Sequence, residues 1–343
     1  MPPNIRSHEQ AGQNRRHDMR MKGFAAALVA WATLTNSAHA VDAALPPYQA
    51  VAGISGQLKS VGSDTLNHEM ILWAEGFKSK YPNVKIEVEG KGSSTALPPL
   101  LSGDAQFGPM SRYMTSAEAD AFEKKYGYKP TAIRVAVDAL AIYVHKDNPV
   151  PCLTLQQLDQ IFSSTRKGSG GKSIDKWGDV GASDAWSEQP ITVYGRNQIS
   201  GTYEFFRQLV LYGGDFKEAV KQEVGSEAVV ESVAKNKFAI GYSGIGYKTS
   251  GVRAVPVASY FGGKCYDTSA DETYSGKYPI ARYLYIYVNK NPNEPLDPLR
   301  AEFIKYILSK DGQIQTEQGG YYPITGEIRE AELKRLGLSD STK

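Results

Sequence analysis

The chain has 343 residues, 41% of them hydrophobic and 22% charged, which is typical of a globular protein with room for two domains. The first forty residues hold five of the 39 basic and two of the 37 acidic side chains, so 34 basic and 35 acidic residues remain after them. This near-neutral remainder gives no electrostatic basis for a nucleic-acid or membrane partner, and any anion-binding site must therefore be local.

The N-terminal segment has the pattern of a secretory signal peptide. The basic stretch 19–22 precedes an apolar run over residues 23–34, and the small residues of Asn-Ser-Ala-His-Ala follow it. The run is too short to span a bilayer, which needs about 20 apolar residues. We therefore predict that residues 1–40 comprise a signal peptide and its upstream segment, with cleavage near Ala40, and that the mature protein is periplasmic or secreted.

From Gly56 onward, short apolar strands alternate with amphipathic helices, which predicts an α/β fold with a mostly parallel sheet. The first helix shows the helical period most clearly, because Leu66, Met70, Trp73 and Phe77 share one face. The expected helices are 65–82, 116–127, 153–164, 204–214 and 299–312. The expected strands are 84–90, 133–137, 140–144, 191–195 and 283–288.

Three segments place a tight turn rich in Gly, Ser and Thr between a strand and a helix. Their sequences are VGSDTLNHEM (61–70), EGKGSSTALPPLL (89–101) and YGRNQISGTYEFF (194–206). A helix start offers unpaired N–H groups and the positive end of the helix dipole, so three such starts could surround one oxyanion. A Ser or Thr at this place is also an ordinary N-cap, so each segment alone leaves both interpretations open.

Two details add to the anion-binding interpretation. In the third segment, Arg196 can offer a two-pronged guanidinium while Ser200 and Thr202 add hydroxyl donors. In the second segment, Pro98 and Pro99 suit the first turn of a helix that begins near Thr95.

Five motifs, in their order along the chain, resemble those of a known family. They are GSDTL (62–66), GKGSSTAL (90–97), FGPMSR (107–112), RNQISGTYEFF (196–206) and AIGYSGIGY (239–247). The resemblance is to the periplasmic phosphate-binding proteins of phosphate ABC transporters, which are type II periplasmic binding proteins. It implies two α/β lobes with inorganic phosphate held in the cleft between them, delivery to an inner-membrane ABC permease, no chemistry on the ligand, no cofactor or metal, and a monomer.

The resemblance also implies which residues hold the phosphate. Carried over by position, they are Thr65 with the Leu66 amide, Ser93, Arg196, Ser200, Gly201 and Thr202. Two positions depart from the pattern of the family, where acidic residues are common: Arg112 follows Ser111, and Gln198 stands between the arginine and the Ser-Gly-Thr. We expect Ser111 and Arg112 to face the anion.

With Arg112 in place of the usual acid, another acceptor is needed for the proton of phosphate. Asp138 is our first candidate, because it interrupts an apolar strand, and a carboxylate there is costly unless it is paired. We expect Arg112 to keep it ionised. Asp64 is the second candidate, although an acid at a helix start also has a purely structural use.

The lobes are expected to be joined by two crossing strands. The chain should leave lobe 1 near Asp138 and return near Arg282, so that lobe 1 comprises 56–137 plus 282–331 and lobe 2 comprises 138–281. Two cysteines occur in the sequence, Cys152 and Cys265, and export to an oxidising compartment favours a disulfide between them within lobe 2.

Two alternatives stay open. An exported phosphatase could use the same phosphate cage, but His68 and His145 follow no zinc-binding spacing, and no G-x-S-x-G elbow is present. The same fold could instead bind another oxyanion, namely sulfate, molybdate or tungstate.

Overall fold

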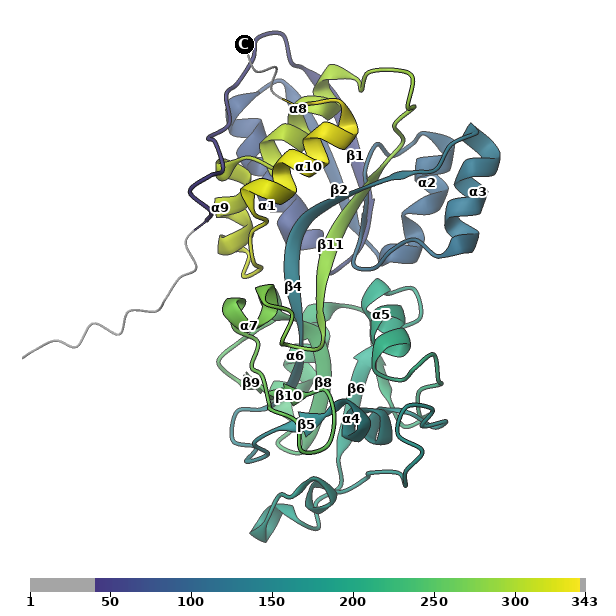
Figure 1. Cartoon of the computed structure of the whole chain (residues 1–343), viewed down its shortest axis with the longest axis vertical. Helices are drawn as coiled ribbons and strands as arrows, with labels where there is room; N and C mark the ends of the chain where they lie inside the picture. The colour runs from purple at the N-terminus through teal and green to yellow at the C-terminus, as the bar shows by residue number, and fades with distance from the viewer. Residues whose placement is uncertain (1–40, 340–343) are drawn as a thin grey trace, which may run out of the picture. The chain divides into compact units, whose positions relative to one another are not determined.

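The structure of the protein is a computed structural model that describes residues 41–339 (Figure 1). The predicted signal peptide and its cleavage near Ala40 lie outside the described residues. Within 41–339, no helix is both long and apolar enough to cross a membrane.

Lobe 1 is built from an N-terminal set of alternating strands and helices and from three helices at the C-terminal end (Figure 1). The N-terminal set is β1 (Gly56–Gly62), α1 (Asn67–Lys80), β2 (Val84–Gly90), the short 3-10 helix η1 (Ser93–Thr95), α2 (Leu97–Ser102), β3 (Gly108–Met110) and α3 (Ser116–Tyr126). The C-terminal set is α8 (Pro298–Ile307), α9 (Lys310–Gln318) and α10 (Gly326–Leu336).

Helix α1 carries the apolar face that its sequence predicts. Met70, Trp73 and Phe77 are fully buried, as is Leu66 just before the helix. The indole N–H of Trp73 donates to the carbonyl oxygen of Gly312 at 3.0 Å, which ties α1 to α9. The N-terminal and C-terminal parts of the chain therefore share one core.

Lobe 2 contains the remaining elements except the crossing strands (Figure 1). Its strands are β5 (Leu153–Thr154), β6 (Thr192–Arg196), β7 (Lys221–Glu223), β8 (Ala239–Gly244), β9 (Val252–Ala254) and β10 (Val257–Ala258). Its helices are α4 (Leu155–Phe162), η2 (Trp177–Val180), η3 (Asp184–Trp186), α5 (Gly201–Leu209), α6 (Ser226–Lys235), η4 (Ile245–Tyr247) and α7 (Ala270–Tyr274). The predicted disulfide between Cys152 and Cys265 is confirmed.

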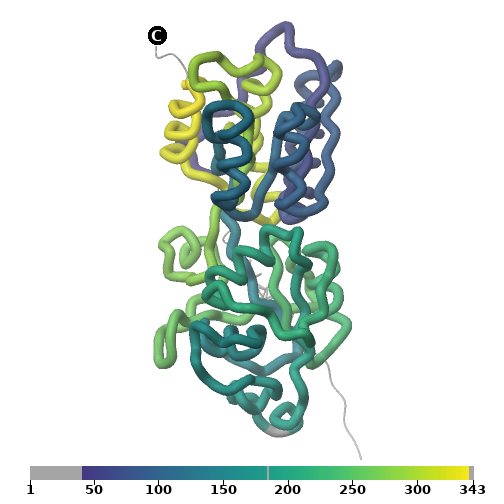
Figure 2. Tube along the Cα trace, turned by 90° about the vertical axis from the view of Figure 1, so that its right-hand side faces the viewer, coloured from purple at the N-terminus to yellow at the C-terminus, as the bar shows by residue number. Residues whose placement is uncertain are grey.

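Two strands, β4 (Thr131–His145) and β11 (Ala281–Val288), run side by side between the two groups of elements in both views (Figures 1 and 2). They pair antiparallel, with Asp138 opposite Arg282. Up to Ala139, β4 pairs with β11; from Leu140 it pairs with β8 and β9. The two short strands expected around Asp138 are thus one continuous strand. The lobe boundaries themselves stay a prediction.

The expectation of a mostly parallel sheet is wrong. The large sheet has the order β3-β11-β4-β8-β6-β7, with β9 also pairing with β4. Its central pairs are antiparallel and only β8, β6 and β7 run parallel to one another, while β1 and β2 form a separate parallel pair. The reason is that β4 and β11 carry the chain in opposite directions, so their pairing must be antiparallel.

Several helix boundaries also differ from expectation, among them those of α5, which was expected over 204–214 and spans Gly201–Leu209. The helix expected over 299–312 is two helices, α8 and α9, because the chain turns at Leu308 and Ser309 restarts it as an N-cap that accepts from Gly312 N. The helix expected from Thr95 begins at Leu97, because Ser93–Thr95 form a 3-10 turn first.

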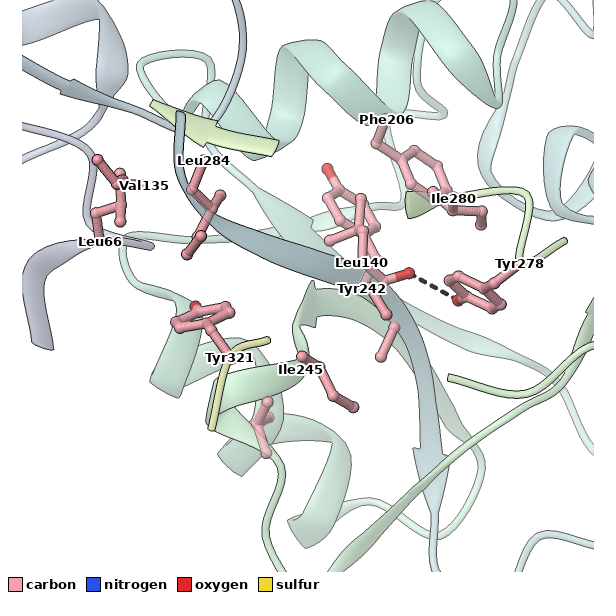
Figure 3. Close-up of a cluster of buried hydrophobic side chains, with 14 of the residues drawn as sticks. Leu66, Val135, Leu140, Phe206, Tyr242, Ile245, Tyr278, Ile280, Leu284 and Tyr321 are labelled. Carbon is pink, nitrogen blue, oxygen red and sulfur yellow. Dashed lines mark hydrogen bonds between the residues drawn. The ribbon is translucent and has the colours of Figure 1, made fainter. Parts of the chain in front are cut away.

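The crossing strands are anchored in a buried cluster shown in Figure 3. The hydroxyl of Tyr278 donates to the carbonyl oxygen of Leu140 on β4 at 2.8 Å. Nearby, the ring of Phe206 on α5 stacks on Tyr242 of β8, with centroids 4.0 Å apart. This packing holds α5 so that its first turn lies beside the crossing strands.

Candidate functional site

Four hydroxyl side chains from separate segments meet in the buried space between the lobes. Thr65 Oγ1 lies 2.9 Å from Thr202 Oγ1, and Ser111 Oγ lies 3.4 Å from both Thr202 Oγ1 and Ser93 Oγ. All four side chains are buried. The hydroxyl cluster, as we call these four residues, brings together three positions from lobe 1 and one from lobe 2.

The lobe 1 members follow the ends of three strands. Thr65 comes after β1, Ser93 after β2 and Ser111 directly after β3. β1 is parallel to β2, and Ser60 of β1 also bridges in parallel to Phe107 just before β3. Because the carboxyl ends of parallel strands meet at one edge, three short turns converge at the same place.

The start of α5 supplies the lobe 2 wall. A Cβ at Gly201 would overlap Ser93 Oγ and lie 2.8 Å from Ser111 Oγ, so only glycine lets the helix approach this closely. Ser200 is the N-cap, and its hydroxyl oxygen accepts from the amides of Thr202 and Tyr203 at 3.1 and 3.3 Å. The hydrogen of that hydroxyl remains available for donation.

Leu66 has a different place from the hydroxyls. Its side chain is fully buried in the core, where Figure 3 labels it, and it is the residue immediately before α1. Its contribution to an anion site would come from its backbone amide at the helix start, as the sequence suggests.

Arg196, the last residue of β6, is buried with 1% of its side chain exposed, and it pairs with Asp64, the residue before Thr65. Its Nη1 donates to Ser226 Oγ at 2.6 Å, and its Nη2 donates to the carbonyl oxygen of Val224 at 3.0 Å. Burial lowers the pKa of the guanidinium, and the nearby carboxylate of Asp64 opposes that shift. The Nε hydrogen has no partner among the described residues, so this charged group keeps a free donor.

A second arginine, Arg282, reaches the cluster and was not among the predicted site residues. Its Nη2 donates to Thr202 Oγ1, its Nη1 to the carbonyl oxygen of Ser111 and its Nε to Asp138 Oδ2, each at 2.9 Å. The sequence did carry a signal, because an arginine at the start of an apolar strand needs a partner as much as Asp138 does.

Asp138 is fully buried, and both of its oxygens accept hydrogen bonds. Oδ2 faces Arg282, with Nη2 at 2.8 Å, and Oδ1 accepts from the amide of Ile245 at 3.0 Å. The expected pairing of Asp138 with Arg112 is therefore wrong, because strand pairing places Arg282 opposite Asp138.

Arg112 is engaged within lobe 1. Its Nη1 and Nη2 form a two-pronged pair with the carboxylate of Glu118 at 2.6 and 2.9 Å, and Nη2 also donates to Ser94 Oγ at 3.2 Å. Glu118 closes the capping box at the start of α3 with Thr115, which fixes the carboxylate in place. The structure thus gives Arg112 a local partner next to Ser111, and its contact with an anion stays a prediction.

Asp64 lies on the lobe 1 side but bonds to lobe 2. Its Oδ2 is 3.0 Å from Arg196 Nη1 and accepts from the amide and hydroxyl of Ser226 at 2.8 and 2.7 Å. Asp64 therefore supplies the acidic partner of Arg196 that Gln198 cannot provide. Its predicted contact with the anion itself also stays a prediction.

The arrangement can hold a small oxyanion by hydrogen bonding. It combines hydroxyl donors, two helix starts and two arginines that are each paired with an aspartate. Within residues 41–339, no group of three or more His, Cys, Asp or Glu side chains is placed to hold a metal ion. The chemistry offered is binding by buried O–H and N–H donors, which form stronger hydrogen bonds than donors exposed to water.

Comparisons with known proteins agree on one family. The sequence profile of the PBP superfamily domain matches residues 48–311. The phosphate-binding protein PstS of Pseudomonas aeruginosa is 49% identical over 323 residues, which cover 93% of this chain and all of that protein. The protein of the same name from Staphylococcus epidermidis is 29% identical over 82% of this chain and 83% of that one.

Solved structures give the same result. A putative phosphate ABC transporter substrate-binding protein from Clostridium perfringens, with bound phosphate, is 27% identical and covers 78% of this chain and 100% of that one, with a TM-score of 0.66. An ABC-type phosphate transport receptor from Vibrio cholerae is 26% identical with the same coverage and a TM-score of 0.60. The two-lobe α/β fold expected from the sequence is thereby confirmed.

Proposed function

This chain belongs to the PBP superfamily and to the family of the phosphate-binding protein PstS, and from that premise we propose that it captures inorganic phosphate between its lobes for an ABC transporter. The observation that carries the proposal is the hydroxyl cluster, in which Thr65, Ser93 and Ser111 of lobe 1 meet Thr202 of lobe 2. Phosphate has four oxygens to satisfy, and donors from both lobes suit it. No chemistry on the ligand is required.

Binding and lobe closure form one equilibrium in this proposal. A ligand favours the closed arrangement only through contacts that the open arrangement lacks, so donors must come from both sides. The turns around Thr65, Ser93 and Ser111 serve from lobe 1, while Arg196 and the start of α5 serve from lobe 2. Arg282, on the crossing strand, is directed at Thr202 and adds a second guanidinium to the site.

Selectivity over sulfate requires a group that accepts the proton of phosphate, and Asp138 remains our proposed acceptor with Asp64 as second choice. A fixed carboxylate accepts a hydrogen bond from protonated phosphate and repels sulfate, which carries no proton. Because both oxygens of Asp138 already accept bonds from Arg282 and Ile245, its contribution includes holding Arg282 in place. Asp138→Asn is expected to lose phosphate affinity and to narrow the preference over sulfate.

Export and delivery complete the proposal. We propose that the chain is exported with cleavage near Ala40, acts as a monomer and delivers phosphate to the permease of an ABC transporter. The delivery step is supported by the similarity to a phosphate ABC transporter substrate-binding protein. The disulfide lies wholly within lobe 2 as we define it, so it leaves lobe closure free.

Isothermal titration calorimetry tests the function directly. Refolded, ligand-stripped mature protein should release or absorb heat with phosphate and show a higher melting temperature, while sulfate, molybdate and tungstate serve as the competing oxyanions. Arg207→Ala, on the last turn of α5 and bonded to Glu204 and Gly213, is the matched control for Arg196→Ala. Absence of both heat and thermal shift at millimolar phosphate would refute phosphate binding, and tighter binding of another oxyanion would reassign the ligand.

A further inference from the structure

Several hydrogen bonds join the lobes away from the hydroxyl cluster, and Asp64 is at the centre of them. Its carboxylate contacts Arg196 and Ser226, as described above, and its backbone carbonyl oxygen accepts from the hydroxyl of Tyr247 at 2.9 Å. Near the rim, the amide of Ser94 also donates across to the carbonyl oxygen of Ile199 at 3.2 Å. The turn that contains Asp64 therefore bonds to three separate segments of lobe 2, at Arg196, Ser226 and Tyr247.

The contact with Ser226 has the geometry of a helix cap that comes from the opposite lobe. Ser226 is the first residue of α6, and the N-cap residue Gly225 has no side chain with which to cap it. Asp64 Oδ2 accepts from the amide and hydroxyl of Ser226, and Oδ1 lies 3.2 Å from where a Cβ at Gly225 would stand. A carboxylate at this place satisfies a free amide and complements the helix dipole.

The same carboxylate orients the arginine of the site. Arg196 Nη1 bonds to both Ser226 Oγ and Asp64 Oδ2, so the head of α6, the arginine and the lobe 1 turn form one bonded group. Gln198, beside the arginine in sequence, cannot supply that negative charge. Separation of the lobes would remove Asp64 from both the guanidinium and the start of α6, because Asp64 lies in lobe 1 and both of its partners lie in lobe 2.

We propose that Asp64 is a closure residue: it caps α6 and fixes Arg196 from the opposite lobe, and so favours the closed, phosphate-holding arrangement. This inference rests on the proposed function and adds a positioning role to it. Binding and closure are one equilibrium, so hydrogen bonds that form only on closing increase the fraction of molecules in the closed state. The apparent affinity for phosphate rises with that fraction.

Two variants of the mature chain separate the parts of this role. Asp64→Ala removes the cap and the charge, and Asp64→Asn keeps an oxygen for the amide of Ser226 but removes the charge. We expect the dissociation constant for phosphate to rise roughly 10- to 100-fold in Asp64→Ala and less in Asp64→Asn, as for losing charge-assisted hydrogen bonds. Glu227→Gln, the next acidic residue on the first turn of α6, is the control and should bind as the unmodified chain does.

A second measurement, small-angle scattering, distinguishes a role of Asp64 in lobe closure from a role in folding stability alone. Small-angle scattering should show the phosphate-free Asp64→Ala protein more open than the phosphate-free unmodified protein, with little change in its melting temperature. An unchanged or higher affinity would overturn the proposal, because Asp64 would then only compete with phosphate for Arg196. A large loss of melting temperature without a shift in scattering would overturn it too. If the unmodified chain binds no phosphate, the proposed function fails instead, which calorimetry on that chain alone decides.

Discussion

The crossing strands and the cleft wall each hold an arginine paired with an aspartate, but the chain holds the two pairs in different ways. Arg282 and Asp138 stand opposite each other on β11 and β4, and their side chains are 3% and 0% exposed. Arg196 ends β6 in lobe 2, whereas Asp64 lies in a turn of lobe 1 and is 21% exposed. Strand pairing keeps the first pair together in any lobe arrangement, whereas the second depends on lobe contact. The Arg282–Asp138 pair should therefore control the free energy of unfolding, and the Arg196–Asp64 pair should control the affinity for phosphate.

The largest effect is expected from breaking the pair in the crossing strands. Asp138→Ala leaves Arg282 buried without its counter-charge, which typically costs about 3–5 kcal/mol. Denaturant unfolding of phosphate-free protein measures this free energy. The double variant Asp138→Leu/Arg282→Met, which removes both charges, should recover much of the loss. A loss below about 1 kcal/mol in the single variant would mean that water replaces the partner.

Breaking the cleft pair should act on binding instead. Arg196→Ala removes a buried, charge-assisted donor, and we expect phosphate binding to weaken by about 1.5–3 kcal/mol. Calorimetry measures this loss, with Arg207→Ala as the control. Equal losses for Arg196→Ala and Ser200→Ala would show that the guanidinium makes no special contact with the ligand.

The hydroxyl of Ser200 serves both the stability of α5 and the proposed phosphate site. Ser200→Ala removes the N-cap of α5, which should cost about 1 kcal/mol of unfolding free energy. Its effect on phosphate binding should be that of one neutral donor, roughly 0.5–1.5 kcal/mol. Ser200→Asp retains a capping oxygen, so it should restore stability while its charge weakens phosphate binding further. Restored phosphate binding in Ser200→Asp would contradict the assignment of the Ser200 hydroxyl as a hydrogen-bond donor to phosphate.

Glu69 on α1 is a buried carboxyl with no arginine partner in the part of the chain that the structure describes, and it provides the contrast. Neither of its oxygens has a hydrogen-bond partner among the described residues, and burial raises the pKa of the carboxyl well above its ordinary value of 4.5. The folded state therefore holds the proton longer than the unfolded state. Below pH 4.5, Glu69 is protonated in both states and does not lower the free energy of unfolding. As the pH rises from 4.5 toward the raised pKa, that free energy falls.

Glu69→Gln should consequently be more stable than the unmodified chain at neutral pH, with a difference that shrinks as the pH is lowered to about 4.5. Thermal unfolding of both proteins from pH 4.5 to 8 measures the difference, which is expected to be the smallest of the effects. A constant difference over this range would show that the carboxyl does not titrate on unfolding.

Much of the hydroxyl cluster could be anticipated because its members occupy local motifs. Thr65, Ser93 and Thr202 each sit in a turn between a strand and a helix or at a helix start, and such turns are recognisable from a few consecutive residues. The same local logic predicted the apolar face of α1. Where local signals overlapped, as at Asp138 and at Ser309, the boundaries shifted, because tertiary pairing and helix capping decide where an element ends.

Short-range patterns in the sequence were sufficient for the α/β class and the helix-start motifs, and the cysteine count with the export signal was sufficient for the disulfide between Cys152 and Cys265. The two lobes were expected from the family resemblance. Which charges pair depends on the three-dimensional packing of the chain. Arg282 meets Asp138 through the register of two strands that are 144 residues apart in the chain, and Asp64 meets Arg196 through the contact of two lobes. Ion pairs of this kind depend on where distant segments come together in space. Residue type and local spacing do not specify which segments these are.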